Sequence, residues 1–154
     1  MKNLRWLMIS LMVIALDQGS KQYVVHHFVY QNPVPLCAWL NITLNFNSGA
    51  AFSFLANTSD WHRWFLSGLA LLISAILLVW IIQTEQNKKA ALIAYTLILG
   101  GALSNLIDRF VFGYVIDFID FHLGGWHFAT FNLADSAITV GAILLGLLLI
   151  FKRV

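Results

Sequence analysis

The stretch FNLADSAITVGAILLGLLLIF, residues 131–151, decides the fold. From Leu133 to Phe151 it is apolar, apart from Asp135 and a few hydroxyl residues. A helix needs about 20 such residues to cross a bilayer, and lipid admits only segments whose backbone groups are paired internally. The stretch therefore predicts a membrane-spanning helix with a carboxylate in its first turn, and this carboxylate needs an explanation.

Three more segments have the same character, at residues 4–28, 62–83 and 90–110. Hydrophobic residues make up 60% of the 154 residues and charged residues only 10%, whereas soluble domains carry about 25% charged residues. We predict an all-α membrane protein, a single domain over residues 1–154 with four transmembrane helices, the last at 133–151. The net charge of +2 is too small and scattered for a nucleic-acid partner.

Basic residues gather on one side of the predicted spans. They precede the first span, separate the second from the third and follow the fourth: Lys2, Arg5, Lys88, Lys89, Lys152 and Arg153. Because Lys and Arg favour the cytoplasmic side, both termini are expected to be cytoplasmic and the loops at 29–61 and 111–132 external. A charged start before an apolar run also fits a signal peptide, but the LDQGSK that follows does not resemble a cleavage site, so we expect the segment to be retained.

The two external loops carry signs of β-structure. Residues 39–47, WLNITLNFN, alternate apolar and polar side chains, which predicts a half-buried strand. Residues 121–128, FHLGGWHF, place two glycines between aromatic flanks, which favours a hairpin turn. We expect a small β-structure at the outer face of the membrane, with tryptophans near the lipid headgroups: Trp39, Trp61, Trp64 and Trp126.

Charged and amide side chains within the predicted spans are candidates for function, because charge inside a membrane is costly. Asp17 and Lys21 are spaced i,i+4 and can pair, either as a structural ion pair or as a contact to substrate or to an active-site loop. Asn105 and Arg109 have the same spacing. Arg109 could snorkel to the interface, but it breaks the inside-positive pattern, so we favour a partner inside the protein. Asp108 is expected to pair locally or to face water.

The stretch GGALSNLIDR, residues 100–109, also predicts close helix packing, because its small residues allow backbones to approach.

Asp117 and Asp135 form the most informative pair. Asn132 is a good helix N-cap and Asp135 suits the positive end of the helix, so a purely structural interpretation is open for both. Asp117 alone could be an interfacial loop acid. A hairpin between them, however, could place the two carboxylates side by side. Such a pair shares one proton, so one acid can activate water while the other polarises a carbonyl.

Other hydrolytic chemistries lack their motifs. There is no HExxH zinc motif and no GxSxG serine motif, and no histidine has a helix-spaced partner beside an acid. A metal-dependent mechanism is therefore the weaker alternative.

Five short motifs give the chain a resemblance to the lipoprotein signal peptidase family, the bacterial type II signal peptidases. They are DQGSK at 17–21, NFNSGAAFS at 45–53, GGALSNLIDR at 100–109, VIDFIDF at 115–121 and FNLADS at 131–136. Their order over nearly the whole chain is specific. Ser104 stands where the family usually has glycine.

The resemblance implies an aspartic endopeptidase of the bacterial inner membrane, with its active site near the outer face. It would cleave diacylglyceryl-modified prolipoproteins before the lipidated cysteine, and globomycin would inhibit it. Membrane lipid is the other expected partner, and the resemblance implies that neither a metal nor an organic cofactor is used. By motif, Asp117 and Asp135 would be catalytic, and other residues would line or support the site: Asp17, Lys21, Asn47, Gly49, Asn105, Arg109 and Asn132.

Two other classes remain open on the residues alone. A small proton- or ion-translocating protein would also carry intramembrane Asp, Lys and Arg. Its path would need polar groups across the whole bilayer, whereas the span at 62–83 offers only Ser67 and Ser74 from Trp64 to Ile82. A non-enzymatic scaffold for lipidated partners would tolerate Asp117→Asn.

Overall fold

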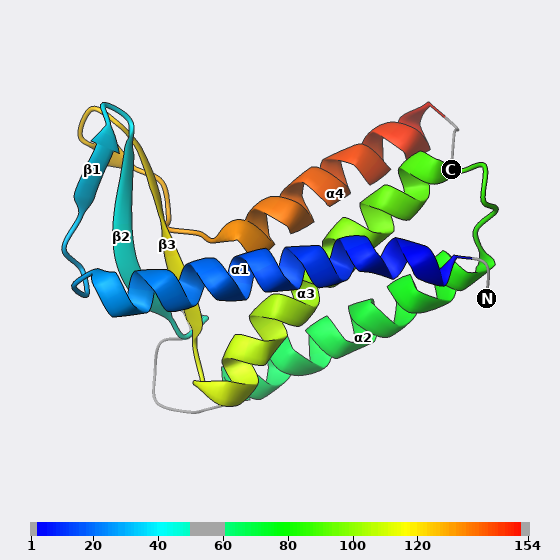
Figure 1. Cartoon of the computed structure of the whole chain (residues 1–154), viewed down its shortest axis with the longest axis horizontal. Coiled ribbons are helices and arrows are strands. Elements are labelled where there is room, and N and C mark those ends of the chain that lie inside the picture. Colours follow the sequence, from blue (N-terminus) through cyan, green and yellow to red (C-terminus); the bar gives the residue numbers. More distant parts are fainter. Residues whose placement is uncertain (1–2, 50–60, 152–154) are drawn as a thin grey trace.

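The computed structural model describes residues 3–49 and 61–151. Within these ranges a 3-10 turn, η1 (Leu4–Trp6), leads into helix α1 (Leu7–His27). The other helices are α2 (Trp61–Gln83), α3 (Lys89–Val111) and α4 (Leu133–Ile150), and the strands are β1 (Val34–Cys37), β2 (Leu40–Asn47), β3 (Val115–Leu123) and β4 (Trp126–His127). The helices follow the predicted segments to within a few residues, because each is a long apolar run (Figure 1).

Helix α3 packs against α1, α2 and α4 and is the most buried of the long apolar helices. Glycines allow this close packing. A Cβ added at Gly100 would lie 2.9 Å from the Cα of Ser10 on α1, and one at Gly101 would clash with the Ala134 carbonyl on α4. From α4, Gly141 approaches the Ala94 carbonyl of α3 in the same way. The predicted role of the small residues at 100–104 is confirmed.

Three of the described helices are long and apolar enough to cross a membrane: α2, α3 and α4. Helix α1 carries Asp17 and Lys21 in its middle and is not among them. Large apolar side chains on the outside of the bundle, such as Leu72 on α2 and Ile143 on α4, are more than half exposed, which suits lipid rather than water.

The strands form one antiparallel sheet in the order β1-β2-β3-β4 at one end of the bundle (Figure 1). The predicted strand at 39–47 and the predicted hairpin are both confirmed, the latter as β3 and β4 joined at Gly124 and Gly125. The expected alternation along β2 is broken by a register shift between Ile42 and Asn45, which changes the face that is buried.

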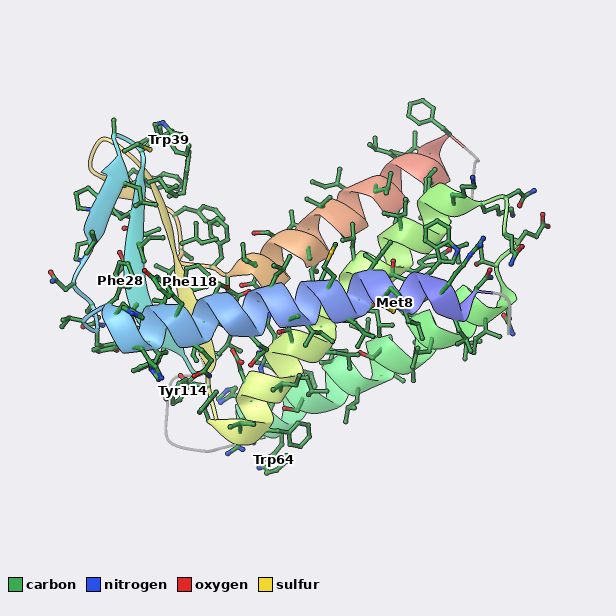
Figure 2. All side chains as sticks on the ribbon, in the orientation of Figure 1. Met8, Phe28, Trp39, Trp64, Tyr114 and Phe118 are labelled. Carbon is green, nitrogen blue, oxygen red and sulfur yellow. The ribbon has the colours of Figure 1, made fainter. Side chains whose placement is uncertain are left out.

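A small apolar core fixes the sheet to the end of α1. Its buried members are Val24 from α1, Leu44 from β2, and Ile116 and Phe118 from β3. Phe28 and Tyr114 pack against it, and Figure 2 shows Phe28 and Phe118 where helix and sheet meet. Because Ile116 and Phe118 flank Asp117, this core sets the position of that acid.

The four predicted tryptophans are roughly half exposed or more: Trp39, Trp61, Trp64 and Trp126. Figure 2 shows Trp39 at the far end of the sheet and Trp64 on the outside of the bundle. Their contact with lipid headgroups stays a prediction.

Candidate active site

Asp117 lies on β3 and only 1% of its surface is exposed. One carboxylate oxygen, Oδ2, accepts a hydrogen bond of 2.9 Å from Nδ2 of Asn47 on the neighbouring strand. The other, Oδ1, accepts one of 2.7 Å from Nδ2 of Asn132. Burial raises the pKa of Asp117 to about 7, although the hydrogen bond from Asn47 opposes this; the charge of Asp135 raises the pKa further. Asp117 is therefore an acid that can hold a proton near neutral pH.

Asn132 joins the two candidate acids. It is the N-cap of α4, and its Oδ1 accepts a hydrogen bond of 2.9 Å from the peptide N–H of Asp135. Asp135 completes the capping box, because its Oδ2 accepts from the peptide N–H of Asn132 at 3.2 Å. The structural interpretation of this pair is thus correct, but the same amide group also holds Asp117. The side chain of Asn132 therefore both caps α4 and links the two acids.

Asn105 on α3 holds Asp135 from the other side. Its Nδ2 donates to Oδ1 of Asp135 at 2.7 Å. Its Oδ1 accepts from Asn132 at 3.1 Å and from Nζ of Lys21 at 3.0 Å. Asn105 therefore connects the two acids to the charged residues in the bundle.

Lys21 pairs with two acids inside the bundle. Its Nζ lies 2.6 Å from Oδ2 of Asp17 and 2.7 Å from Oδ2 of Asp108, and all three side chains are fully buried. The predicted ion pair between Asp17 and Lys21 is confirmed. Both alternatives for Asp108 are wrong: it is buried rather than facing water, and it pairs with a residue far away in the sequence, because α1 and α3 pack side by side here.

Each buried acid holds the peptide group just before a candidate catalytic acid. Oδ1 of Asp17 accepts from the peptide N–H of Ala134 at 2.8 Å, immediately before Asp135. Oδ2 of Asp108 accepts from the peptide N–H of Ile116 at 3.1 Å, immediately before Asp117. Lys21 thus anchors two parallel supports, one for each acid.

A neutral donor completes each support. Oγ of Ser104 donates to Oδ2 of Asp17 at 2.7 Å, and Nε2 of Gln18 donates to Oδ1 of Asp108 at 2.7 Å. The sequence reasoning missed Gln18 and Asp108 as members of the site and treated Ser104 only as a packing residue. Their signal was the helix spacing: Gln18 is i−3 from Lys21, and Ser104 and Asp108 are spaced i,i+4.

Asn47 is fixed by the turn that follows β2. Its Oδ1 accepts a hydrogen bond of 2.9 Å from the peptide N–H of Gly49, which leaves Nδ2 directed at Asp117. Gly49 has a φ of +92°, and a Cβ there would lie 2.8 Å from Cδ1 of Leu66. The backbone conformation requires glycine, whereas the end of the Leu66 side chain could move to make room for a Cβ. The rest of the predicted motif, residues 50–53, lies outside the described residues.

Arg109 is half-buried and its Nη1 donates to the carbonyl of Asn105 at 3.3 Å. It therefore has a partner inside the protein, as we favoured. Among the described residues it makes no ion pair within 4.0 Å. Its guanidinium interacts electrostatically with both candidate acids without forming an ion pair, so it adds positive charge to the site.

Asp120 belongs to a separate cluster. It accepts hydrogen bonds from Asn41 at 3.0 Å and from His127 at 2.9 Å. Burial raises the pKa of Asp120, but the hydrogen bonds from His127 and Asn41 outweigh it, so the pKa lies below its usual value. Three residues along a strand reverse the face, which directs Asp120 away from Asp117. In the part of the chain that the structure describes, no group of three or more His, Cys, Asp or Glu side chains could hold a metal ion.

Comparison with known proteins identifies the family. Residues 9–151 match the family described as signal peptidase (SPase) II. The chain belongs to the signal peptidase II family. Among its relatives, the lipoprotein signal peptidase of Photorhabdus laumondii is 53% identical over 140 residues, covering 91% of this chain and 84% of the relative. The lipoprotein signal peptidase of Escherichia coli O6:K15:H31 is 51% identical over 145 residues, covering 94% and 88%.

Solved structures agree with this assignment. A chain described as a bacterial membrane enzyme solved by the in meso method superposes with a TM-score of 0.84 at 32% identity, covering 94% of this chain and 92% of that one. A second such structure gives a TM-score of 0.84 at 31% identity, covering 96% and 88%. As a member of the signal peptidase II family with several apolar helices, the protein is a peptidase and a multi-pass membrane protein.

Proposed function

We propose that the protein is an aspartic endopeptidase that removes the signal peptide from diacylglyceryl-modified prolipoproteins, cutting before the lipidated cysteine. The observation that carries this proposal is the bridge made by Asn132, which donates to the carboxylate of Asp117 and accepts from the peptide N–H of Asp135. The names of the relatives, lipoprotein signal peptidases, support the substrate class.

The environments of the two acids assign them different tasks. Asp117, with a pKa of about 7, begins the reaction protonated. We assign Asp135 the ionised role, because two neighbouring acids share one proton, and its carboxylate accepts from Asn105 and from the peptide N–H of Asn132. These donors stabilise a negative charge.

The reaction then proceeds by general acid–base steps. Water attacks the scissile carbonyl carbon, its proton passes to Asp135, and Asp117 gives its proton to the carbonyl oxygen. In the second step the protonated Asp135 donates to the amide nitrogen as the C–N bond breaks, and Asp117 recovers a proton from a hydroxyl of the tetrahedral intermediate. The products are the free amine of the cysteine and the carboxyl end of the signal peptide, and both acids return to their starting states.

We place the site at the outer face of the bacterial inner membrane, with α1 as a fourth span and both termini cytoplasmic. The acyl chains of the precursor stay in lipid, which brings the scissile bond to the interface. Arg5 precedes α1, and Lys88 and Lys89 begin α3, at the end of the bundle away from the sheet (Figure 1). Lys2, Lys152 and Arg153 lie outside the described residues. A globomycin-type cyclic peptide would occupy the site beside Asp117 and Asp135.

The ion-translocating alternative is not favoured. The ion pairs that Lys21 makes with Asp17 and Asp108 lie between the middle and the sheet end of α1 and near the sheet end of α3. Along α2, the buried polar side chains are Ser67 and Ser74. A continuous path would need further polar groups towards the other membrane face.

The proposal is tested by cleavage of a diacylglyceryl-modified precursor with purified protein in detergent, followed as a gel shift. We expect wild type to release the signal peptide and both Asp117→Asn and Asp135→Asn to lose it, while each still folds. Asp120→Asn is the matched control, because it makes the same change in the same strand as Asp117 without touching the site. Near-full activity in either Asp117→Asn or Asp135→Asn would show that the two-acid mechanism is wrong.

A further inference from the structure

Ser104 is a fully buried hydroxyl in contact with the charged residues beneath the site. Its Oγ donates to Oδ2 of Asp17 at 2.7 Å and accepts from Nε2 of Gln18 at 3.1 Å. Because the amide of Gln18 can only donate through this nitrogen, the hydroxyl hydrogen of Ser104 is directed at Asp17. The hydrogen bond to the carboxylate is therefore fixed in direction.

We propose that Ser104 is a positioning residue for Asp135 and acts through Asp17. The inference rests on the proposed function, since it assigns Asp135 a catalytic task. The chain of contacts is short: Ser104 holds Oδ2 of Asp17, and Oδ1 of Asp17 holds the peptide N–H of Ala134, which precedes Asp135.

Charge balance explains why Asp17 needs this donor. Lys21 is shared between Asp17 and Asp108, so two buried carboxylates have one ammonium group between them. A buried charge with too few donors is costly, and water does not reach these side chains, which are 0% exposed. Without Ser104, Oδ2 of Asp17 is held by Lys21 alone. The carboxylate is then free to turn towards Lys21 and to loosen its hold on Ala134.

The hydroxyl of Ser104 also fills the space beside Asp17 and Gln18. A glycine would leave a space on the order of 30 Å³, enough for one water molecule with polar partners on two sides. In this protein the hydroxyl of Ser104 takes the place of such a water molecule and donates the hydrogen bond to Asp17.

The test compares Ser104→Ala with Ser104→Thr in the precursor-cleavage assay. We expect Ser104→Ala to lower kcat about tenfold with KM unchanged, less than the ~100-fold that a 1 Å misplacement of reacting groups can cost. Ser104→Thr keeps the hydroxyl and should restore kcat to within about twofold of wild type. The matched control is Ser10→Ala. Ser10 is also buried and bonds α1 to α3, donating to the Thr96 carbonyl at 2.7 Å, but it touches none of the charged residues.

The outcomes separate this proposal from the proposed function. If Asp135→Asn is inactive while Ser104→Ala keeps wild-type kcat, only the role of Ser104 is overturned. An equal loss in Ser104→Ala and Ser10→Ala overturns it too, because the effect is then general helix packing. An active Asp135→Asn overturns both proposals. If Ser104→Ala does not fold, Ser104→Cys, which has nearly the same shape but a weak donor, replaces it with the same expected loss.

Discussion

The peptide N–H of Ile116 donates a hydrogen bond of 3.1 Å to Oδ2 of Asp108. This bond ties the start of β3 to the end of α3, so the position of Asp117 depends on a carboxylate that does not contact it. Asp17 acts in the same way on Ala134, ahead of Asp135. The positions of Asp117 and Asp135 are thus fixed through backbone hydrogen bonds to two other carboxylates, and these two carboxylates share Lys21.

Asp108→Asn should lower both stability and activity. An amide oxygen in the place of Oδ2 could still accept from Lys21 and Ile116, but the amide nitrogen in the place of Oδ1 would face the donor of Gln18. At least one hydrogen bond is therefore lost, together with the negative charge that pairs with Lys21. Breaking a buried pair of this kind costs about 3–5 kcal/mol. We expect a clearly lower Tm in detergent and a reduced cleavage rate. Glu85→Gln, the same change at an exposed position, is the control. A wild-type Tm in Asp108→Asn would contradict the supporting role.

The pH profile of cleavage should fall on its alkaline side. Asp117 must be protonated to act as the acid, so kcat/KM should be full below its pKa of about 7 and be lost as the pH rises through that value. The hydrogen bond from Asn47 lowers this pKa. Asn47→Ala should therefore move the alkaline limb to higher pH.

The control for this profile is Asn41→Ala, which removes the equivalent amide from Asp120 on the same pair of strands. Its alkaline limb should coincide with that of wild type. A limb that stays in place in Asn47→Ala, or that moves to lower pH, would show that Asp117 is not the titrating acid.

Gly101→Ala should separate α4 from α3. The added methyl group would meet the Ala134 carbonyl and lie 2.7 Å from Cγ1 of Ile138. Overpacking of this kind costs about 1–3 kcal/mol, and here it displaces the helix turn that carries Asp135. We expect a lower Tm and a loss of cleavage. Gly146→Ala on α4 meets nothing within 4 Å and should be neutral or slightly stabilising; equal effects of the two changes would exclude a specific contact at Gly101.

The helices, and the approach of Asp117 and Asp135 to a shared neighbour, Asn132, could be predicted because their signals are local. A long apolar run has few alternatives to a helix, and the glycines at 124–125 indicate the hairpin that returns the chain to Asn132. Strand β1 was not predicted, since Pro35 and a short VPLC segment show no alternation. The register shift in β2 was not predicted either, because it depends on the pairing with β3 rather than on β2 itself.

The support beneath the site was only half predictable. The spacing of Asp17 and Lys21 indicates an ion pair within one helix. The second acid, Asp108, comes from another helix, and nothing in its own neighbourhood distinguishes burial from exposure. Its place is set by the close contact of α1 and α3 at Gly100, a tertiary effect that the sequence of either helix does not contain.

The charges shared by α1 and α3 also bear on how the protein is made. In the proposed four-span arrangement, α1 enters the bilayer before α3 has been synthesised. Its Asp17 and Lys21 are one turn apart and form an ion pair, so this part of α1 carries no net charge while it is in lipid without α3. Asp108 reaches Lys21 only when α3 arrives and packs. Helix α4, which carries Asp135, follows α3 in the chain, so the ion pair between Lys21 and Asp108 can form before the second candidate acid is synthesised.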